Sequence, residues 1–427
     1  MIVDNIQQIQ NLKNKSVFLY PIKKDDRLHR CNNPIIGFVV IDTQSKEAYT
    51  ISNGHCDGIL NTSNLDFLKD CKVYCYDVIS FKYCGYNTDS YIDAQMQYYL
   101  FTNKPYELDT PGVVNHYTRQ YQNCHKINDL VPLHKHEEIA LNIFNDIWIA
   151  DEQAGLSFYQ HQLQNVFYNI ERHGLSIDPI LFEERFSKTF SRVGNACYSQ
   201  YNYYTTTGRP SNRFGGINFA ALNKEDDTRN CFVNRLGTLV EIDFNSYHPR
   251  LIASLIGYDF KNENVYEHLA KHYSNTQTPT QEDIEKAKEM TFRQIYGGIQ
   301  QQYMHIPFFA SIEALAQEIW REANSSGYVE SPISKRRLVL ANYQDITVYT
   351  LLNYFIQMYE TEQNVTMLDE LFKTLDKDIV PILYTYDSIL FDLPKDKCEL
   401  LQESLNKVIP THFPFKIKTG SNYKCLQ

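Results

Sequence analysis

Two apolar segments that each carry an aspartate constrain the fold of this chain most strongly. The first, LVEIDF at residues 239–244, reaches Asp243 at its end. The second, DIVPILYTYDSILFDLP, is apolar on both sides of Asp387, which predicts a buried β-hairpin with an acid at its tip. A carboxylate beside buried strands needs a partner or a cation. If the strands are neighbours, the two carboxylates could hold a pair of Mg²⁺ ions; otherwise they are unrelated acids that face solvent.

Composition sets wide bounds on function. The chain has 427 residues, enough for two or three domains, and its 43% hydrophobic and 22% charged residues are typical of a globular protein. The net charge of −10 gives no overall basic field for a polyanion, although a groove needs only local positive charge. We find no apolar run of membrane-spanning length, no signal peptide and no CxxC spacing, and therefore expect a soluble cytoplasmic protein with reduced thiols.

The pattern along the chain predicts a mixed α/β protein. In residues 1–150 the runs SVFLYPI, IIGFVVIDTQSKEAYTIS and KVYCYDVI predict strands, and SYIDAQMQYYLF and HEEIALNIFNDIWIADEQ predict helices. A long amphipathic helix follows in LSFYQHQLQNVFYNIERHGLSIDP, with Leu163, Val166, Phe167 and Ile170 on one face and Gly174 as its stop. We place a domain boundary near residue 150.

A further helix carries a pattern that suits a nucleotide. The segment TPTQEDIEKAKEMTFRQIYGGIQ predicts a helix that begins after Thr280 and ends near Gly297. Lys288, Phe292 and Tyr296 recur every four residues and therefore share one face. A cation followed by two rings suits a triphosphate, a sugar and a base, although an aromatic stripe with this spacing is also typical of a core.

Six segments of this chain resemble family-A DNA polymerases, which include bacterial DNA polymerase I and the polymerases of T7-like phages. The resemblance covers roughly residues 155–425 in the family's order. LQNVFYNIERHGLSIDP is similar to the entry into the polymerase domain, TTTGRPSNRFGGINFAALNK to the T-G-R element, VEIDFNSYHPRLIASLIG to motif A, KEMTFRQIYGG to motif B, LLNYFIQMYETE to the minor-groove segment and YTYDSILFD to motif C.

The resemblance implies a right-hand polymerase fold. Residues 209–250 and 336–427 would form the palm and residues 251–335 the fingers. Residues 151–208 would form a reduced thumb, since only about thirty residues separate Asp178 from Arg209. Residues 1–150 would form a degenerate RNase H-like 3′–5′ exonuclease domain.

The resemblance also implies roles for site residues. Asp243 and Asp387 would hold two Mg²⁺ ions, or Mn²⁺ as a substitute, with the carbonyl of Phe244. Lys288 would bind the incoming triphosphate and donate a proton to the leaving pyrophosphate or stabilise its charge. Phe292 would pack on the sugar of the deoxynucleotide, and Tyr296 would stack near the templating base.

Further positions would contact primer–template DNA. Arg209, Asn353 and Gln357 would lie in the minor groove, where the acceptors look alike in every correct base pair. Arg336 and Arg337, in the cluster SKRRL, would lie near a phosphate backbone; the alternative is a solvated loop.

The chain also departs from the family pattern. Motif C lacks its second acid, because Ser388 follows Asp387, and in motif B an arginine is replaced by Ile284 and a glycine by Arg293. His248 stands where the family has a glutamate that blocks the ribose 2′-hydroxyl. Its bulk beside Phe292 predicts that deoxynucleotide preference survives; the alternative is a histidine that merely packs under Pro249.

The front segment lacks the acids of an exonuclease. Its first strand carries no Asp-x-Glu pair; Asp77 resembles a later acid of that site, and Asp89 and Asp93 are candidate remnants. One or two acids cannot build a two-metal hydrolytic site, so we expect no proofreading. The run HKHEE at residues 134–138 is interpreted as a solvated helix start, with a metal cluster as the alternative.

Together these patterns predict a template-dependent DNA polymerase that uses Mg²⁺, dNTPs and primer–template DNA and serves phage or viral replication. The reduced thumb and the negative net charge predict weak, salt-sensitive DNA binding and a processivity factor or other replisome partner. Two alternatives stay open. One is a relative of single-subunit RNA polymerases or primases, and the other is a decayed scaffold that binds primer–template without catalysis.

Overall fold

The computed structural model describes residues 1–25, 28–58, 60–104, 106, 128–149, 154–186, 193–214, 217–261, 263–274 and 276–426. The chain divides into two compact units, Met1–Tyr168 and Asn169–Gln427, and each is described by itself. This division lies beyond the position near residue 150 expected from the sequence. Among the described residues, no helix is both long enough and apolar enough to cross a membrane.

The first unit is built on a five-stranded sheet with the order β3-β2-β1-β4-β5. The central strand β1 runs antiparallel to β2 and parallel to β4, which in turn runs parallel to β5. The three runs predicted as strands in this segment correspond to β1, to β2 with β3, and to β4. The strands are β1 Ser16–Lys23, β2 Ile35–Asp42, β3 Ala48–Ser52, β4 Lys72–Cys75 and β5 Ile92–Asp93.

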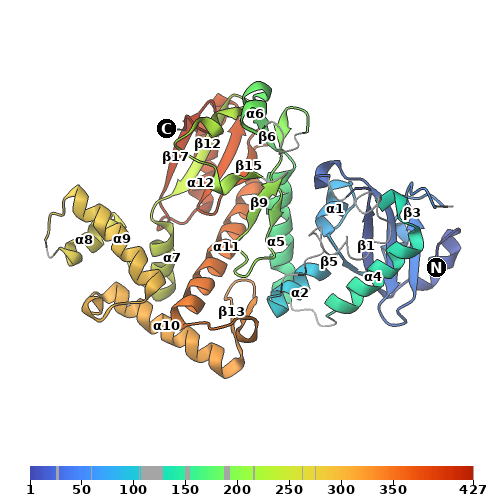
Figure 1. The fold of residues 1–427 in the computed structure, drawn as a ribbon, viewed down its shortest axis with the longest axis horizontal. Helices are drawn as coiled ribbons and strands as arrows, with labels where there is room; N and C mark the ends of the chain where they lie inside the picture. The colour runs from blue at the N-terminus through green and yellow to red at the C-terminus, as the bar shows by residue number, and fades with distance from the viewer. Residues whose placement is uncertain are drawn as a thin grey trace. The chain divides into compact units, whose positions relative to one another are not determined.

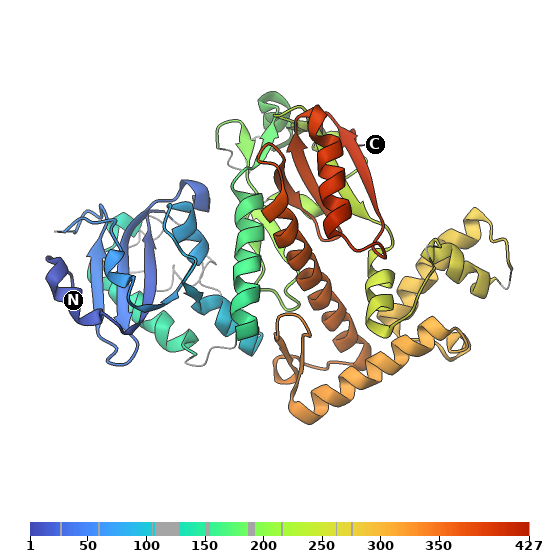
Figure 2. The same cartoon turned by 180° about the vertical axis from the view of Figure 1, so that it is seen from behind.

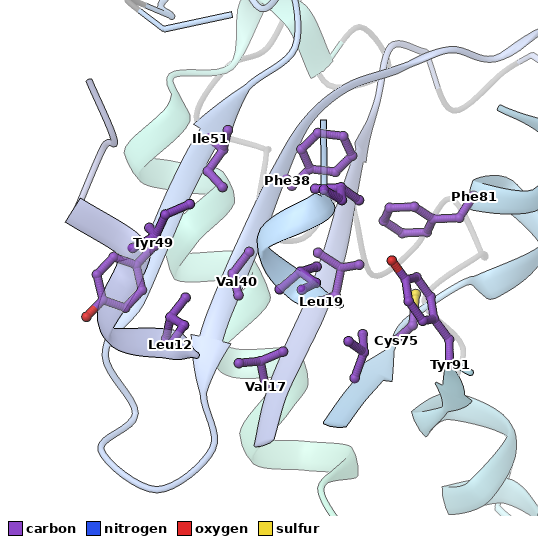
Figure 3. Close-up of a cluster of buried hydrophobic side chains, with 14 of the residues drawn as sticks. Leu12, Val17, Leu19, Phe38, Val40, Tyr49, Ile51, Cys75, Phe81 and Tyr91 are labelled. Atoms are coloured by element: carbon purple, nitrogen blue, oxygen red, sulfur yellow. The ribbon is translucent and has the colours of Figure 1, made fainter. Parts of the chain in front are cut away.

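Both faces of this sheet are buried. Successive side chains of a strand point to opposite faces, and consecutive residues of β1 and β2 are buried. Val17 and Leu19 of β1 belong to one apolar cluster, which Figure 3 shows together with residues such as Phe38 and Phe81. Phe18 belongs to a second cluster, formed with helix α4. The helices of this unit are α1 Val78–Tyr83, α2 Ala94–Thr102 and α4 Leu133–Ile147, followed by α5 Ala154–Glu171, which reaches past the division.

Helix α5 confirms the amphipathic helix predicted from the sequence. The four apolar residues expected on one face are all buried: Leu163, Val166, Phe167 and Ile170. Gly174 adopts a positive φ of 62°, a conformation that a side chain would strain, so the chain can turn from the helix into the next strand.

The centre of the second unit is a four-stranded antiparallel sheet with the order β15-β16-β12-β17. The predicted hairpin with an acid at its tip is confirmed, since Asp387 lies in the turn between β15 and β16. Figures 1 and 2 show helix α12 lying along this sheet. The elements are β12 Thr238–Phe244, β15 Val380–Tyr384, β16 Ser388–Leu393, β17 Phe415–Gly420 and α12 Cys398–Val408.

Helices extend from this sheet toward one end of the second unit (Figure 1). The helix predicted to begin after Thr280 is confirmed as α9: Thr280 and Asp283 form a capping box, and Gly298 caps the other end at a φ of 106°. The helices of this part are α7 Tyr247–Ile256, α8 Val265–Tyr273, α9 Gln281–Gly297, α10 Pro307–Ser326 and α11 Val348–Thr374.

Short elements complete the second unit. One small sheet has the order β11-β6-β7, another has the order β10-β9-β8, and β13 pairs with β14. These elements are β6 Leu175–Ile177, α6 Pro179–Phe186, β7 Ala196–Cys197, β8 Tyr201–Asn202, β9 Ser211–Phe214, β10 Ile217–Asn218, β11 Phe232–Val233, β13 Tyr328–Glu330 and β14 Arg337–Val339.

Candidate active site

The two aspartates singled out from the sequence lie on neighbouring strands. In the antiparallel register of β12 and β16, Asp243 is opposite Ser388, the residue after Asp387. The amide of Phe244 donates to the carbonyl oxygen of Asp387 at 3.1 Å, and Tyr386 turns the hairpin with a φ of 63°. The strands are therefore neighbours, and the sheet brings the two acids to one place, which decides between the two alternatives left open by the sequence.

The two acids have different surroundings. Desolvation in the cleft, together with the nearby Asp243 and Glu360 carboxylates, raises the pKa of Asp387. Asp243 instead holds a cation from strand β17: its Oδ2 lies 2.7 Å from Nζ of Lys418, which also lies 3.2 Å from Oε2 of Glu241. Sequence reasoning missed Lys418, because only the pairing of β12 with β17 brings it next to Asp243.

The oxygens gathered here suit a hard cation. Carboxylates and backbone carbonyls are the ligands that Mg²⁺ prefers, and Asp243, Asp387 and the carbonyl of Phe244 supply both kinds. Ser388 offers only a hydroxyl, which lies 2.6 Å from Oγ1 of Thr385. The donor set therefore fits a metal, with one acid fewer than the family pattern and with Lys418 on one oxygen of Asp243.

A cleft of about 760 Å³ opens beside these acids. This volume is within the range of small-molecule sites. Its walls come from β12, α7, α8, α9, the turn at Asp387 and the start of β17, and include Asp243, Phe244, Asp387, Lys416, Arg250 and Tyr266.

The predicted face of α9 lines this cleft. Lys288, Phe292 and Tyr296 all border it, and the rings of Phe292 and Tyr296 stack with centroids 5.8 Å apart and planes 5° apart. Lys288 is exposed, with its Nζ 5.9 Å from the ring centroid of Tyr266. The structure thus brings the cation and both rings to the two aspartates.

His248 lies between α9 and α11. Its Nδ1 is hydrogen bonded to the hydroxyl of Tyr296, and its Nε2 lies 2.8 Å from Oε1 of Glu360. Glu360 is 1% exposed, and its Oε2 lies 3.2 Å from Nε of Arg209. Sequence reasoning missed Glu360, because α11 also carries Glu362, Asp369 and Glu370, and no local pattern distinguishes Glu360 from them.

The three residues predicted to contact the minor groove lie near this network. The Arg209 guanidinium lies over the ring of Tyr386 at 4.1 Å. Gln357 accepts a hydrogen bond from Oγ1 of Thr207 at 3.1 Å, and Asn353 donates to the carbonyl oxygen of Tyr296 at 3.2 Å. The loop before Arg209 and helix α11 are therefore joined through side chains.

The prediction that Arg336 of the cluster SKRRL lies near a phosphate backbone is wrong. The Arg336 side chain is 2% exposed and donates to the carbonyl oxygens of Thr205 and Thr206 at 3.3 and 2.8 Å, so it cannot meet a phosphate backbone at the surface. Arg337 is partly buried, stacks over Tyr328 at 4.4 Å and lies 3.5 Å from Glu330. The sequence pattern could not show that the first arginine points inward.

Replacing Arg336 with alanine is expected to destabilise the second unit by about 3 kcal/mol, because a buried cation that holds two carbonyls is lost. The control is Arg337→Ala, which removes a partly exposed arginine from the next position and is expected to cost below about 1 kcal/mol. Chemical denaturation of both variants measures the difference. Equal losses would contradict the structural role given to Arg336.

The acids of the first unit hold structural partners. Asp77 caps α1, accepts from Oγ of Ser80 at 2.6 Å and lies 3.0 Å from Nζ of Lys23. Burial opposes its ionisation, but Lys23 and Arg30 outweigh burial and lower the pKa of Asp77. Asp89 is exposed. Lys23 therefore balances the charge of Asp77 in this structure.

Asp93 is buried, and among the described residues no cation forms an ion pair with it. Its side chain accepts from the amide of Met96 at 2.8 Å and from Nε2 of Gln164 at 2.9 Å. Burial raises its pKa to about 7, and the Asp77 charge adds to this.

This pKa predicts a pH-dependent stability of the first unit. Between about pH 4 and pH 7 folded Asp93 keeps a proton that the unfolded chain has lost, so stability falls as pH rises through this window. Three pKa units correspond to at most about 4 kcal/mol. Asp93→Asn is expected to melt at a higher temperature than wild type at pH 8 and to lose that advantage at pH 4. A melting difference that does not change with pH would contradict the raised pKa.

The run HKHEE lies at the start of α4, but this start is only partly solvated, because His134 is exposed and His136 is not. Among the described residues, neither histidine belongs to a group with metal-ligand spacing. His136 is buried, its Nε2 lies 2.9 Å from the carbonyl oxygen of Asn128, and burial lowers its pKa to about 4. Within the described part of the first unit, a different trio has ligand-like spacing: His55, Cys56 and Asp129. Both ring nitrogens of His55 are engaged by backbone groups, so this trio is not preorganised for a metal.

Comparison with known proteins supports the fold. No protein-family model and no curated protein matches the sequence. The structure is similar to a solved structure described as the POL domain of Pol1 from M. smegmatis in complex with DNA primer-template and dNTP. The TM-score is 0.70 over 98% of both chains, at 11% sequence identity. The chain therefore has the mixed α/β fold of a polymerase domain, as the sequence patterns predicted.

Proposed function

We propose that this chain is a template-dependent DNA polymerase that adds deoxynucleotides to a primer 3′ end. The observation that carries the proposal is the meeting of Asp243, Asp387 and the Lys288–Phe292–Tyr296 face of α9 at one cleft. These groups come from separate parts of the chain, and their positions match the motifs that resemble family-A polymerases. The fold of the M. smegmatis Pol1 domain supports the same reading.

Asp243 and Asp387, with the carbonyl of Phe244, would hold the Mg²⁺ ions. Bound there, the metal would activate the primer 3′-oxygen and offset negative charge on the α-phosphate and the leaving pyrophosphate. Lys418 would release the Asp243 oxygen that it holds in this structure and keep its contact with Glu241.

The remaining groups of the cleft position the substrates. The primer 3′-oxygen forms a bond to the α-phosphorus, and the bond to pyrophosphate breaks in line with it. Lys288 binds the triphosphate and donates a proton to pyrophosphate or stabilises its charge. Phe292 packs on the sugar, Tyr296 stacks near the templating base, and His248 blocks the space of a ribose 2′-hydroxyl.

Primer–template would lie beside α11. Arg209, Asn353 and Gln357 would contact the minor groove, where such contacts test base-pair geometry. Arg209 would have to exchange part of its contact with Glu360 for DNA. We further propose a role in phage or viral replication in the host cytoplasm, together with a processivity factor. Extension of hundreds of nucleotides per encounter by the isolated protein would remove the need for that factor.

The first unit is proposed to lack proofreading, because Lys23 and backbone groups hold Asp77 and Asp93. A labelled primer with a mismatched 3′ end, incubated with Mg²⁺ and no dNTP, is expected to keep its length. Shortening that persists in Asp387→Asn and disappears in Asp77→Asn would contradict this proposal.

Template-directed incorporation tests the function itself. Four primer–templates that differ only in the templating base are each offered single dNTPs and single rNTPs with Mg²⁺. We expect addition of the complementary dNTP on each template. Preferred addition of rNTPs would favour the relative of RNA polymerases or primases, and DNA binding without any addition would favour the decayed scaffold.

A further inference from the structure

A buried carboxylate lies behind the wall of the cleft. Glu360 of α11 is 1% exposed and does not border the cleft, whereas His248, Tyr296 and Arg209 do. An acid in such a place is costly unless it is paired and hydrogen bonded. Its position, one layer behind the residues that would meet substrate, suggests that it acts through them.

The contact between Glu360 and His248 fixes the imidazole. A carboxylate accepts hydrogen bonds, so the His248 Nε2 that lies 2.8 Å from Oε1 of Glu360 must donate. In the neutral ring Nδ1 then becomes the acceptor, and the hydroxyl of Tyr296 donates to it. One buried oxygen therefore determines the tautomer of His248, its ring orientation and the direction of the Tyr296 hydroxyl.

The second contact of Glu360 is of a different kind. Its Oε2 lies 3.2 Å from Nε of Arg209, yet neither atom makes a well-aligned hydrogen bond with a described residue. Nη2 of Arg209 donates to Oε1 of Glu360, but at 3.5 Å this hydrogen bond is much longer than the 2.8 Å contact between Oε1 and Nε2 of His248. Arg209 is therefore held more weakly than His248 and can move without breaking the hold on the imidazole. The His248 contact is the one with the geometry to position a group.

The surroundings keep the Tyr296 hydroxyl protonated. Burial, with the nearby Glu360 charge, raises the pKa of Tyr296 well above its ordinary value. Its hydroxyl is therefore a donor at neutral pH and stays bound to His248. Tyr296 also stacks on Phe292, so the chain of contacts runs from Glu360 through His248 to the ring assigned to the deoxynucleotide sugar.

We propose that Glu360 is a positioning residue that holds His248 against the sugar site and thereby sets the discrimination between deoxyribose and ribose. The inference rests on the proposed function. The bulk that blocks a 2′-hydroxyl is supplied by the imidazole, but an imidazole that can rotate leaves the space open. The glutamate behind it removes that freedom.

The test compares kcat/KM for one rNTP and its dNTP in wild type, Glu360→Leu and Glu362→Gln. Leucine has a similar volume but cannot accept from His248. Glu362 is the matched control, since it is a buried acid on the same helix whose partners are Ser331 and Ser334. Misfolded molecules contribute to neither rate, so the ratio does not depend on the folded fraction.

We expect the rNTP/dNTP ratio to rise at least about tenfold in Glu360→Leu, equivalent to about 1.4 kcal/mol of lost discrimination, and to stay within about twofold in Glu362→Gln. His248→Phe keeps the bulk but has no nitrogen for Glu360 to hold, so it should raise the ratio as well. Adding Glu360→Leu to His248→Phe should raise it no further, because the two residues act as one unit.

An unchanged rNTP/dNTP ratio in Glu360→Leu would overturn the inference. If Glu360→Leu does not fold, an unchanged ratio in His248→Phe would overturn it instead. In both cases the proposed function, a polymerase that incorporates dNTPs, would stand. Equal changes of the rNTP/dNTP ratio in Glu360→Leu and Glu362→Gln would also overturn it. The loss of either buried acid of α11 would then have the same effect, whether or not that acid contacts His248. A wild-type protein that adds neither nucleotide would instead overturn the proposed function.

Discussion

Asp387→Asn is expected to lower the rate of nucleotide addition by on the order of a thousandfold. Asparagine keeps the shape of the side chain but removes the charge that Asp387 presents to the cleft beside Asp243. The loss should fall on the chemical step, so DNA binding should change little. Single-turnover addition of one dNTP to a bound primer measures the rate directly.

The matched control for this variant is Asp392→Asn. Asp392 lies on the same hairpin, in β16, but its carboxylate accepts from the amides of Arg235 and Leu236 at 2.8 and 3.0 Å, outside the cleft. Its variant is expected to keep a rate within several-fold of wild type. Similar losses in both variants would mean that the hairpin's integrity, rather than the Asp387 charge, limits the reaction.

Lys288→Ala is expected to lower kcat/KM for the dNTP by about 100- to 1000-fold, since both triphosphate binding and charge stabilisation at pyrophosphate are lost. Lys288→Arg keeps the charge but cannot give up a proton at neutral pH. If Lys288→Arg restores part of the kcat/KM that Lys288→Ala loses, the restored part is due to the positive charge. The part that is not restored is due to proton donation.

Lys286→Ala serves as the matched control on the same helix. Lys286 is exposed, pairs with Glu282 at 2.6 Å and does not border the cleft. Its replacement should leave kcat/KM nearly unchanged. A loss in Lys286→Ala as large as that in Lys288→Ala would show that the general positive charge of α9, and not the position of Lys288, matters.

The parts of the site predicted from the sequence are those set by local patterns. The hairpin around Asp387 follows from two apolar runs and a turn, and the start of α9 follows from the capping box at Thr280. The four-residue period of Lys288, Phe292 and Tyr296 placed them on one face before their surroundings were known.

The parts that were missed depend on contacts between distant segments. Glu360 meets His248 across 112 residues and Arg209 across 151, and Lys418 meets Asp243 across 175. No local pattern encodes such pairs. Arg336 was misjudged for the related reason that a run of basic residues does not show which one folds inward.

The most direct test of the two-aspartate site compares Asp243→Asn with Glu241→Gln. Both acids lie on β12 and contact Lys418, but only Asp243 borders the cleft. Single-turnover addition of a complementary dNTP with Mg²⁺ is measured for wild type and both variants. We expect Glu241→Gln to stay within several-fold of wild type and Asp243→Asn to lose on the order of a thousandfold. Equal rates in the two variants, or no addition by wild type, would contradict the account.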